Sequence, residues 1–151
     1  MDNSAIKATL NRLIETCKDG QEGYRTASED VEDTNLKSLF SSFSLQRSEF
    51  AGELQDVLVN LGESRPEDES SYTGALHRGW INLKQALAGK ERQAILSECE
   101  RGDDAAVSEY ESALEEELPV PVKEVVLKQY NEIKAARDRV KELRNIAEAA
   151  E

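Results

Sequence analysis

Residues 36–61 read LKSLFSSFSLQRSEFAGELQDVLVNL, and this stretch decides the fold. Its apolar side chains recur every three or four residues, which places them on one face of an α-helix. They are Leu36, Leu39, Phe40, Phe43, Phe50, Leu54, Val57, Leu58 and Leu61. Gly62 follows, and glycine is the residue that most often ends a helix. The pattern predicts a helix over about residues 35–61, with Arg47 at the centre of its apolar stripe.

Other segments repeat this periodicity on both sides of the first. They predict three more long helices and one short one, over about residues 4–32, 90–118, 121–147 and 72–88. Asn3 or Ser4 is expected to cap the first helix and Gly89 to end the short one. Residues 119–121 (PVP) separate the last two helices, because proline cannot continue a helix. Residues 63–71 are polar and acidic and predict a surface loop.

Composition agrees with one all-helical domain spanning residues 1–151. Charged residues make up 33% of the chain and aromatic residues 5%, with only 3 prolines and 8 glycines, which favours long helices. A net charge of −12 repels phosphate backbones and anionic lipids, so a nucleic-acid partner is not expected. The opening MDNSAIKATL lacks the basic segment and apolar run of a signal peptide, and no stretch approaches the length of a membrane span. We therefore expect a cytoplasmic protein.

The order of the segments predicts a ferritin-like four-helix bundle with an additional short crossover helix. The first two long helices are joined so tightly that they must lie antiparallel. The short helix and its loop stand between the second and third long helices, where ferritin-like folds have their long crossover. A simple up-down-up-down bundle with an elaborated loop is the alternative interpretation.

A weak internal repeat supports an arrangement of two helical hairpins. Residues 17–22 (CKDGQE) resemble residues 99–104 (CERGDD), 82 positions further on. The pattern QxxE at residues 46–49 recurs at residues 129–132, 83 positions further on. Near-equal offsets indicate hairpins related by a pseudo-twofold axis, and chance similarity between amphipathic helices is the alternative.

Polar residues interrupt the stripes near the middle of the predicted bundle. Counting 100° per residue around each helix places six of them there: Gln21, Arg47, Glu98, Asp103, Gln129 and Glu132. An arginine among carboxylates and amides favours a buried ion-pair network that fixes helix register. Arg47 turned out to solvent is an alternative. Tyr24, Tyr110 and Tyr130 lie near the stripes and are expected to be core residues with bonded hydroxyl groups.

A metal site is the other interpretation of this layer. Ferritin-like metal proteins place a glutamate on two helices and Glu-x-x-His on the other two. Here the only histidine, His77, lies in the predicted crossover helix, and Arg47 brings a fixed positive charge to the place of the metal ions. We therefore expect no cofactor. The alternative is an iron or manganese site built from Glu49, Glu98, Asp103 and Glu132.

No catalytic residue is predicted elsewhere. The sequence has no glycine-rich phosphate loop, nucleophile elbow or catalytic triad. Cys17 and Cys99 lie on apolar stripes without metal-type spacing, so they read as buried thiols. Trp80 is expected to pack the crossover helix onto the bundle, with His77 and Arg78 facing water.

Four stretches resemble one known family. They are GALHRGW at 74–80, CERGDDAA at 99–106, QR at 46–47 and DRV at 138–140. The chain resembles, over nearly its whole length, an uncharacterised bacterial family that is a domain of unknown function among ferritin-like four-helix bundles. The resemblance implies a bacterial, cytoplasmic protein of ferritin-like fold, linked to stress or envelope maintenance. It supplies no catalytic residues, and the wider superfamily's metal ligands do not carry over because the matching positions hold Gln, Arg and Asp.

These observations predict a non-catalytic, acidic bundle that acts through protein contacts, most simply as a homodimer or larger homo-oligomer. The alternatives are the carboxylate metal-binding protein described above and an adaptor recruited through the acidic surface or the crossover helix. An adaptor of that kind predicts salt-sensitive binding to a basic partner.

Overall fold

The computed structural model describes residues 1–62 and 79–150, and this part of the chain contains helices and no strand. The prediction of an all-α fold is confirmed for these residues. The helices are α1 (Asn3–Asp30), α2 (Thr34–Asn60), α3 (Leu83–Gly89), α4 (Arg92–Leu114) and α5 (Val120–Ala149).

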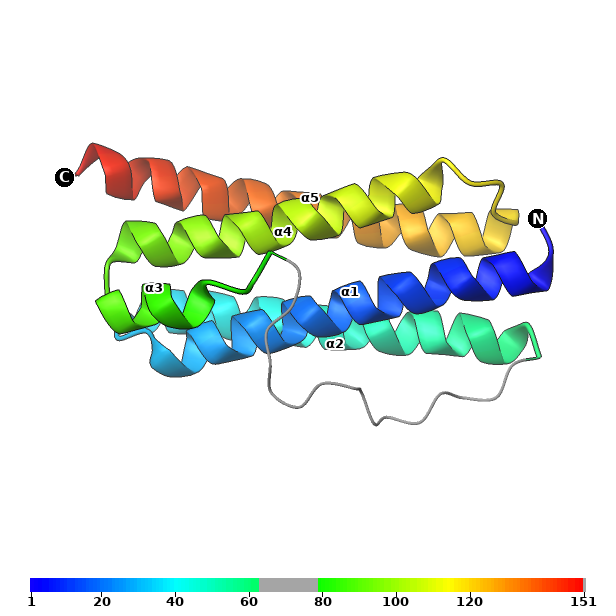
Figure 1. Cartoon of the computed structure of the whole chain (residues 1–151), viewed down its shortest axis with the longest axis horizontal. Helices are drawn as coiled ribbons and strands as arrows, with labels where there is room; N and C mark the ends of the chain where they lie inside the picture. The colour runs from blue at the N-terminus through cyan, green and yellow to red at the C-terminus, as the bar shows by residue number, and fades with distance from the viewer. Residues whose placement is uncertain (63–78, 151) are drawn as a thin grey trace.

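The four long helices run side by side along one axis (Figure 1). α1 packs along α2, α4 packs along α5, and the two hairpins meet through α1 against α4 and α2 against α5. α2 and α4 run in the same direction, so α2 ends at one end of the bundle and α3 lies near the other (Figure 1). Every pair of adjacent long helices is therefore antiparallel, whereas a simple up-down-up-down bundle would require α2 and α4 to be antiparallel.

The helix termini follow local chemistry, with two differences from the predictions. The side chain of Asp2, rather than Asn3 or Ser4, caps α1 by accepting a hydrogen bond from the backbone N–H of Ala5 at 2.9 Å. Gly62 has a φ of +91°, as a glycine at the end of a helix requires. At the end of α3 the left-handed residue is Lys90, with a φ of +58°, and Gly89 is the last helical residue.

The predicted crossover helix over residues 72–88 is wrong in its first described residues. Residues 79–82 are not helical and α3 begins only at Leu83, while residues 72–78 lie outside the described part. Gly79 passes so close to α4 that a Cβ there would lie 2.6 Å from the carbonyl oxygen of Arg101. This contact and the insertion of Trp80 into the bundle hold the backbone out of a helix at this point.

The fourth predicted helix is also shorter than expected. α4 ends at Leu114 instead of residue 118, although Leu118 is still buried. Pro119 disfavours helical geometry in the residue before it. Three successive glutamates, Glu115 to Glu117, meet the negative end of the helix dipole, which also disfavours continuation.

The buried apolar side chains form two clusters, one in each half of the bundle. One cluster joins Leu10, Leu54, Tyr110 and Val126, among others, near the N-terminus of α1. The second contains Trp80 with Phe40, Leu96 and Val140, among others, near the opposite end. The buried side chains of Arg47 and Asp103 lie between these two apolar clusters.

Trp80 fills a gap left by two glycines on facing helices. The indole is only 1% exposed. A Cβ at Gly23 of α1 would lie 2.4 Å from Cδ2 of Trp80, and one at Gly102 of α4 would lie 2.1 Å from Cε2. The Trp80 ring also meets the Tyr24 ring edge-on, with centroids 4.9 Å apart. The prediction that Trp80 packs onto the bundle is confirmed, but it does so from a non-helical segment.

Substitution of Gly102 by alanine tests this packing. We expect Gly102→Ala to lower the free energy of unfolding by about 1–3 kcal/mol, because the new methyl group overlaps the Trp80 ring. Gly52→Ala is the matched control. A Cβ at Gly52 meets nothing within 4 Å, so this variant should gain about 0.5–1 kcal/mol from helix propensity alone. Urea denaturation of both variants measures the difference, and equal effects would contradict the packing.

Candidate functional site

An ion pair between Arg47 of α2 and Asp103 of α4 occupies the middle of the bundle. Nη1 of Arg47 donates to Oδ1 of Asp103 at 2.7 Å. The two side chains are 1% and 0% exposed. Charges so deeply buried are tolerated only when they are paired and hydrogen-bonded. The alternative in which Arg47 turns out to solvent does not describe this structure.

Tyr24 of α1 completes the group around Asp103. Its hydroxyl donates to Oδ2 of Asp103 at 2.5 Å, so each carboxylate oxygen accepts one hydrogen bond. The guanidinium carbon of Arg47 lies 5.4 Å from the centroid of the Tyr24 ring, within the range of a cation–π contact. One carboxylate thus joins side chains from three helices.

Local sequence makes room for the guanidinium. A Cβ at Gly20 would lie 3.0 Å from Nη1 and 3.3 Å from Cγ of Arg47, so a glycine lets the side chain pass close to the α1 backbone. Nε of Arg47 donates to Oε1 of the neighbouring Gln46 at 3.1 Å. Nη2 is buried and has no hydrogen-bond partner among the described residues. Both N–H groups of Nη2 therefore lack an acceptor within the described part of the chain.

The electrostatics of the group favour the protonated forms of Arg47 and Tyr24. Burial disfavours the charged guanidinium, but the charge and hydrogen bond of Asp103, together with Tyr24 and Cys17, outweigh burial and raise the pKa of Arg47. Burial, with the nearby negative charge of Asp103, raises the pKa of Tyr24 well above its ordinary value. Arg47 and Tyr24 therefore both keep their protons at neutral pH.

Gln129 of α5 belongs to a second buried polar group. Its Nε2 donates to the carbonyl oxygen of Phe50 at 3.2 Å, and its Oε1 accepts the hydroxyl proton of Tyr110 at 2.7 Å. Sγ of Cys17 lies 3.0 Å from the same hydroxyl oxygen. A tyrosine hydroxyl has one proton to donate, so the Cys17 thiol is the donor in that contact. Burial raises the pKa of Cys17 to about 11.

The remaining predicted residues lie apart from these two groups. Gln21 is half-buried, and its backbone carbonyl accepts a hydrogen bond from the hydroxyl of Ser44 at 2.8 Å. Glu98 is buried, with Oε1 3.7 Å from Nη1 of Arg101. Glu132 is exposed. The six predicted residues therefore do not form one layer. Arg47 and Asp103 form an ion pair, Gln129 belongs to a separate group, and the other three side chains lie outside both.

The four carboxylates of the metal alternative do not converge. Asp103 and Glu98 are buried, whereas Glu49 and Glu132 are exposed. Within residues 1–62 and 79–150, no three His, Cys, Asp or Glu side chains are placed to hold one metal ion. The donors of an iron or manganese centre are hard oxygens with imidazole, and here the Asp103 oxygens are already bonded to Arg47 and Tyr24. The residues of this described part do not fit such a centre.

The sequence patterns predicted part of this arrangement. Tyr24 and Tyr110 are fully buried with bonded hydroxyl groups, as predicted, and Tyr130 is partly exposed and bonds Glu111 at 2.9 Å. The link between Tyr24 and Asp103 was not predicted, because a stripe on one helix does not show which residue it faces. Small residues on the stripes, Gly20 among them, were the available signal that large side chains cross there.

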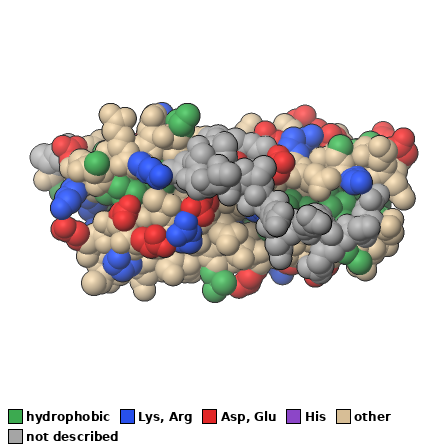
Figure 2. All heavy atoms as spheres, turned by 60° about the horizontal axis from the view of Figure 1, so that its bottom comes forward, with side chains coloured by type: hydrophobic (Ala, Val, Ile, Leu, Met, Phe, Trp, Pro, Cys, Tyr) green, Lys and Arg blue, Asp and Glu red, His purple; other side chains and the backbone are tan. Residues whose placement is uncertain are grey.

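The described surface carries mixed charge. On the face drawn in Figure 2, acidic and basic side chains are interspersed and apolar side chains form only small areas. Ion pairs across the long helices include Arg12 with Glu109 at 3.1 Å and Arg144 with Glu100 at 2.5 Å. None of the described helices combines the length and the apolar character that crossing a membrane requires.

Fold and site together define a helical bundle, in the described part of the chain, with a buried ion pair at its centre. The chain belongs to the family described as a domain of unknown function (DUF2383), which matches residues 5–116. The match includes Tyr24, Arg47 and Asp103 and ends just after α4, so Gln129 of α5 lies outside it. No curated protein matches the chain.

Removal of one partner tests the buried ion pair. We expect Arg47→Met to lower the free energy of unfolding by about 3–5 kcal/mol, because it leaves the carboxylate of Asp103 buried without its cation. The double variant Arg47→Met with Asp103→Leu should recover much of that loss, since it removes both charges. Urea denaturation measures all three proteins.

Arg25→Met is the control for the ion pair. Arg25 pairs with Glu22 and Glu29 on the surface of α1, where its side chain is 48% exposed, and exposed pairs contribute about 0–1 kcal/mol. A loss in Arg47→Met no larger than the loss in Arg25→Met would contradict a structural role for the buried pair.

The Cys17 thiol makes stability depend on alkaline pH. Its folded pKa of about 11 lies above the ordinary value of 9.0, so the contribution is complete below pH 9 and is lost as the pH rises from 9 to 11. Over that range the free energy of unfolding should fall by about 1.4 kcal/mol per pH unit for this proton. Urea denaturation at several pH values should show a smaller slope for Cys17→Ala. Identical slopes would count against this assignment.

Proposed function

We propose that this protein is a non-catalytic, ferritin-like helical bundle that acts through protein contacts. The observation that carries the proposal is the Arg47–Asp103 ion pair at the middle of the bundle. In ferritin-like metal proteins this region holds carboxylate and histidine ligands. In this protein the guanidinium of Arg47 is bonded to the carboxylate of Asp103, which a metal ion would need as a ligand.

The arrangement of the helices supports the ferritin-like part of the proposal. Two antiparallel hairpins, α1–α2 and α4–α5, are joined by a connection that links opposite ends of the bundle, with α2 and α4 parallel (Figure 1). Ferritin-like folds also join their two hairpins by one long crossover. A bacterial, cytoplasmic role linked to stress is part of the proposal and rests on the sequence resemblance.

The chemistry of the buried groups supports a non-catalytic role. Arg47 and Asp103 neutralise each other, Tyr24 keeps its proton, and all three are closed to solvent. The raised pKa of Cys17 keeps that thiol protonated at neutral pH, and the thiolate is the reactive form. No substrate can reach these groups without opening the bundle.

Apolar side chains on the outside of the bundle support self-association. Leu45 of α2 and Leu127 and Ile146 of α5 are all exposed, on the two helices that pack against each other on one side of the bundle. Burial of such side chains stabilises a contact between copies. The proposal is therefore a homodimer or larger homo-oligomer.

One purified sample tests both parts of the proposal. Full-length protein prepared without chelator is passed through size-exclusion chromatography, with light scattering for mass and elemental analysis of the same peak. We expect substoichiometric iron and manganese and a mass of at least twice the 16.8 kDa of one chain. Stoichiometric metal that is lost in Glu132→Gln would overturn the non-catalytic reading in favour of a carboxylate metal-binding protein. A clean monomer at high concentration would remove the assembly.

A further inference from the structure

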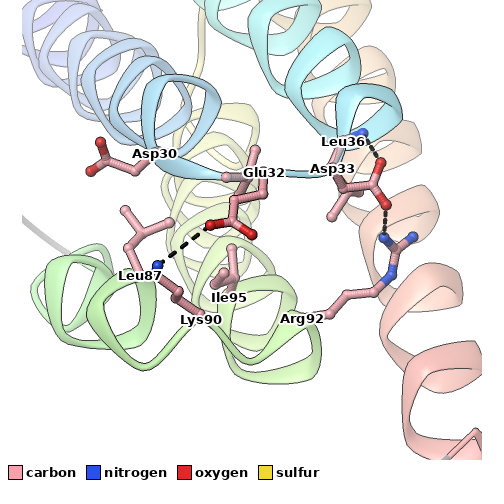
Figure 3. A pocket seen from close by; sticks show the side chains of 9 residues that line it. Asp30, Glu32, Asp33, Leu36, Leu87, Lys90, Arg92 and Ile95 are labelled. Atoms are coloured by element: carbon pink, nitrogen blue, oxygen red, sulfur yellow. Dashed lines mark hydrogen bonds and ion pairs between the residues drawn. The ribbon is translucent and has the colours of Figure 1, made fainter.

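A cavity opens at the end of the bundle where the turn between α1 and α2 meets the turn between α3 and α4 (Figure 3). Its volume is about 290 Å³. Buried apolar side chains from three helices and one turn line it: Leu36, Leu87, Ile95 and Val31. The charged lining comes from Asp30, Glu32, Asp33, Lys90 and Arg92. An apolar surface with a few charged groups beside it is the usual composition of a small-molecule site.

The charges at the cavity are held in two different ways. Arg92 donates to Asp33, which also accepts the backbone N–H groups of Asn35 and Leu36 as the cap of α2. These hydrogen bonds, led by that from Leu36, hold the pKa of Asp33 below its ordinary value. Asp33 and Arg92 are therefore committed to the structure of the helix ends.

The pair between Glu32 and Lys90 is much looser. Nζ of Lys90 lies 3.4 Å from Oε1 of Glu32, and the two side chains are 74% and 81% exposed. Pairs this exposed contribute little to stability. Figure 3 shows the two side chains reaching toward each other at the cavity, one from the α1–α2 turn and the other from the end of α3. Either partner can be replaced at small cost.

The side chain of Lys90 indicates the chemical class of ligand that the cavity could bind. It presents an aliphatic stem and an ammonium group to a carboxylate beside an apolar lining. Its backbone adopts a φ of +58°, a left-handed conformation that costs a non-glycine residue about 1–2 kcal/mol. The residue just before it, Gly89, lies in ordinary helical geometry. The strained position is thus the one that brings an alkylammonium group to Glu32.

We propose that this cavity binds a small organic ammonium ion with an apolar body. The ligand's ammonium group takes the place of Lys90 beside Glu32, and its apolar body covers Leu36, Leu87 and Ile95. The volume suits a ligand with one ring or a short alkyl chain, because it lies at the lower end of the usual range for ligand sites. Acidic residues outnumber basic ones in the lining, and the chain's net charge of −12 favours a cation over a carboxylate. This site is independent of the bundle's proposed role.

Two charge-removing variants at the cavity give opposite expectations. Phenethylammonium is titrated into the full chain by NMR, with 3-phenylpropanoate as the anionic probe of similar size. We expect saturable binding of the ammonium probe, about fivefold weaker in Glu32→Gln because its carboxylate partner is lost. Lys90→Gln should bind it about two- to fivefold more tightly, because the resident ammonium no longer competes for Glu32.

Matched controls separate this site from general charge attraction. Glu142→Gln and Lys141→Gln change the net charge by the same step at exposed positions on α5. Both should leave the affinity for phenethylammonium within about twofold of the parent. All four substitutions are at exposed side chains, and thermal unfolding followed by circular dichroism establishes that each variant folds.

Three outcomes would overturn the proposal. The first is the absence of saturable binding of phenethylammonium up to about 10 mM, a concentration that marks a negligible affinity. The second is an equal loss of affinity in Glu32→Gln and Glu142→Gln, which would show attraction to net charge alone. The third is tighter binding of 3-phenylpropanoate that weakens in Lys90→Gln, which would assign the cavity to an anion.

Discussion

The buried carboxylate of Asp103 is the point to which three helices are tied. It accepts one hydrogen bond from Tyr24 of α1 and another from Arg47 of α2, and it projects from α4. Among the described residues α2 and α4 do not pack directly against each other, so Arg47 has to reach across the middle of the bundle. Only a long side chain spans that distance, and it passes where Gly20 has no Cβ. A buried charge pair costs desolvation, and we propose that it favours this one arrangement of the helices over others.

The Arg47–Asp103 pair restricts how far one helix can slide along its neighbours. A helix that slid by one turn, about 5.4 Å, would separate Arg47 from Asp103 and place one of them against apolar side chains. Trp80 adds a second restriction, because its ring fits only where Gly23 and Gly102 face each other. Gly20 and Gly102 also occupy corresponding positions in the internal sequence repeat, and each makes room for a large side chain. The Arg47–Asp103 pair and the Trp80 ring thus favour one alignment of the α1–α2 hairpin along the α4–α5 hairpin. The pair lies between the two apolar clusters.

Periodicity was enough to predict the long helices, since each stripe is a property of one segment. The Arg47 position was visible for the same reason, as a cation at the centre of an apolar stripe. Contacts between segments were not visible. Nothing local shows that Tyr24 faces Asp103, or that Gln129 bonds Tyr110 in a separate group. Residues 79–82 were assigned to a helix because their composition permits one, but the close approach of Gly79 to α4 overrides that preference.

The position of α5 has a consequence for where this domain begins and ends. The family match stops at Glu116, yet Val126, Ile133 and Val140 of the following helix are buried in the common core. A fragment cut at that border would carry three long helices with an uncovered apolar seam, and Tyr110 would lose its bond to Gln129. The hydrophobic core therefore extends beyond the residues that the family match covers, because the last helix contributes buried side chains to it.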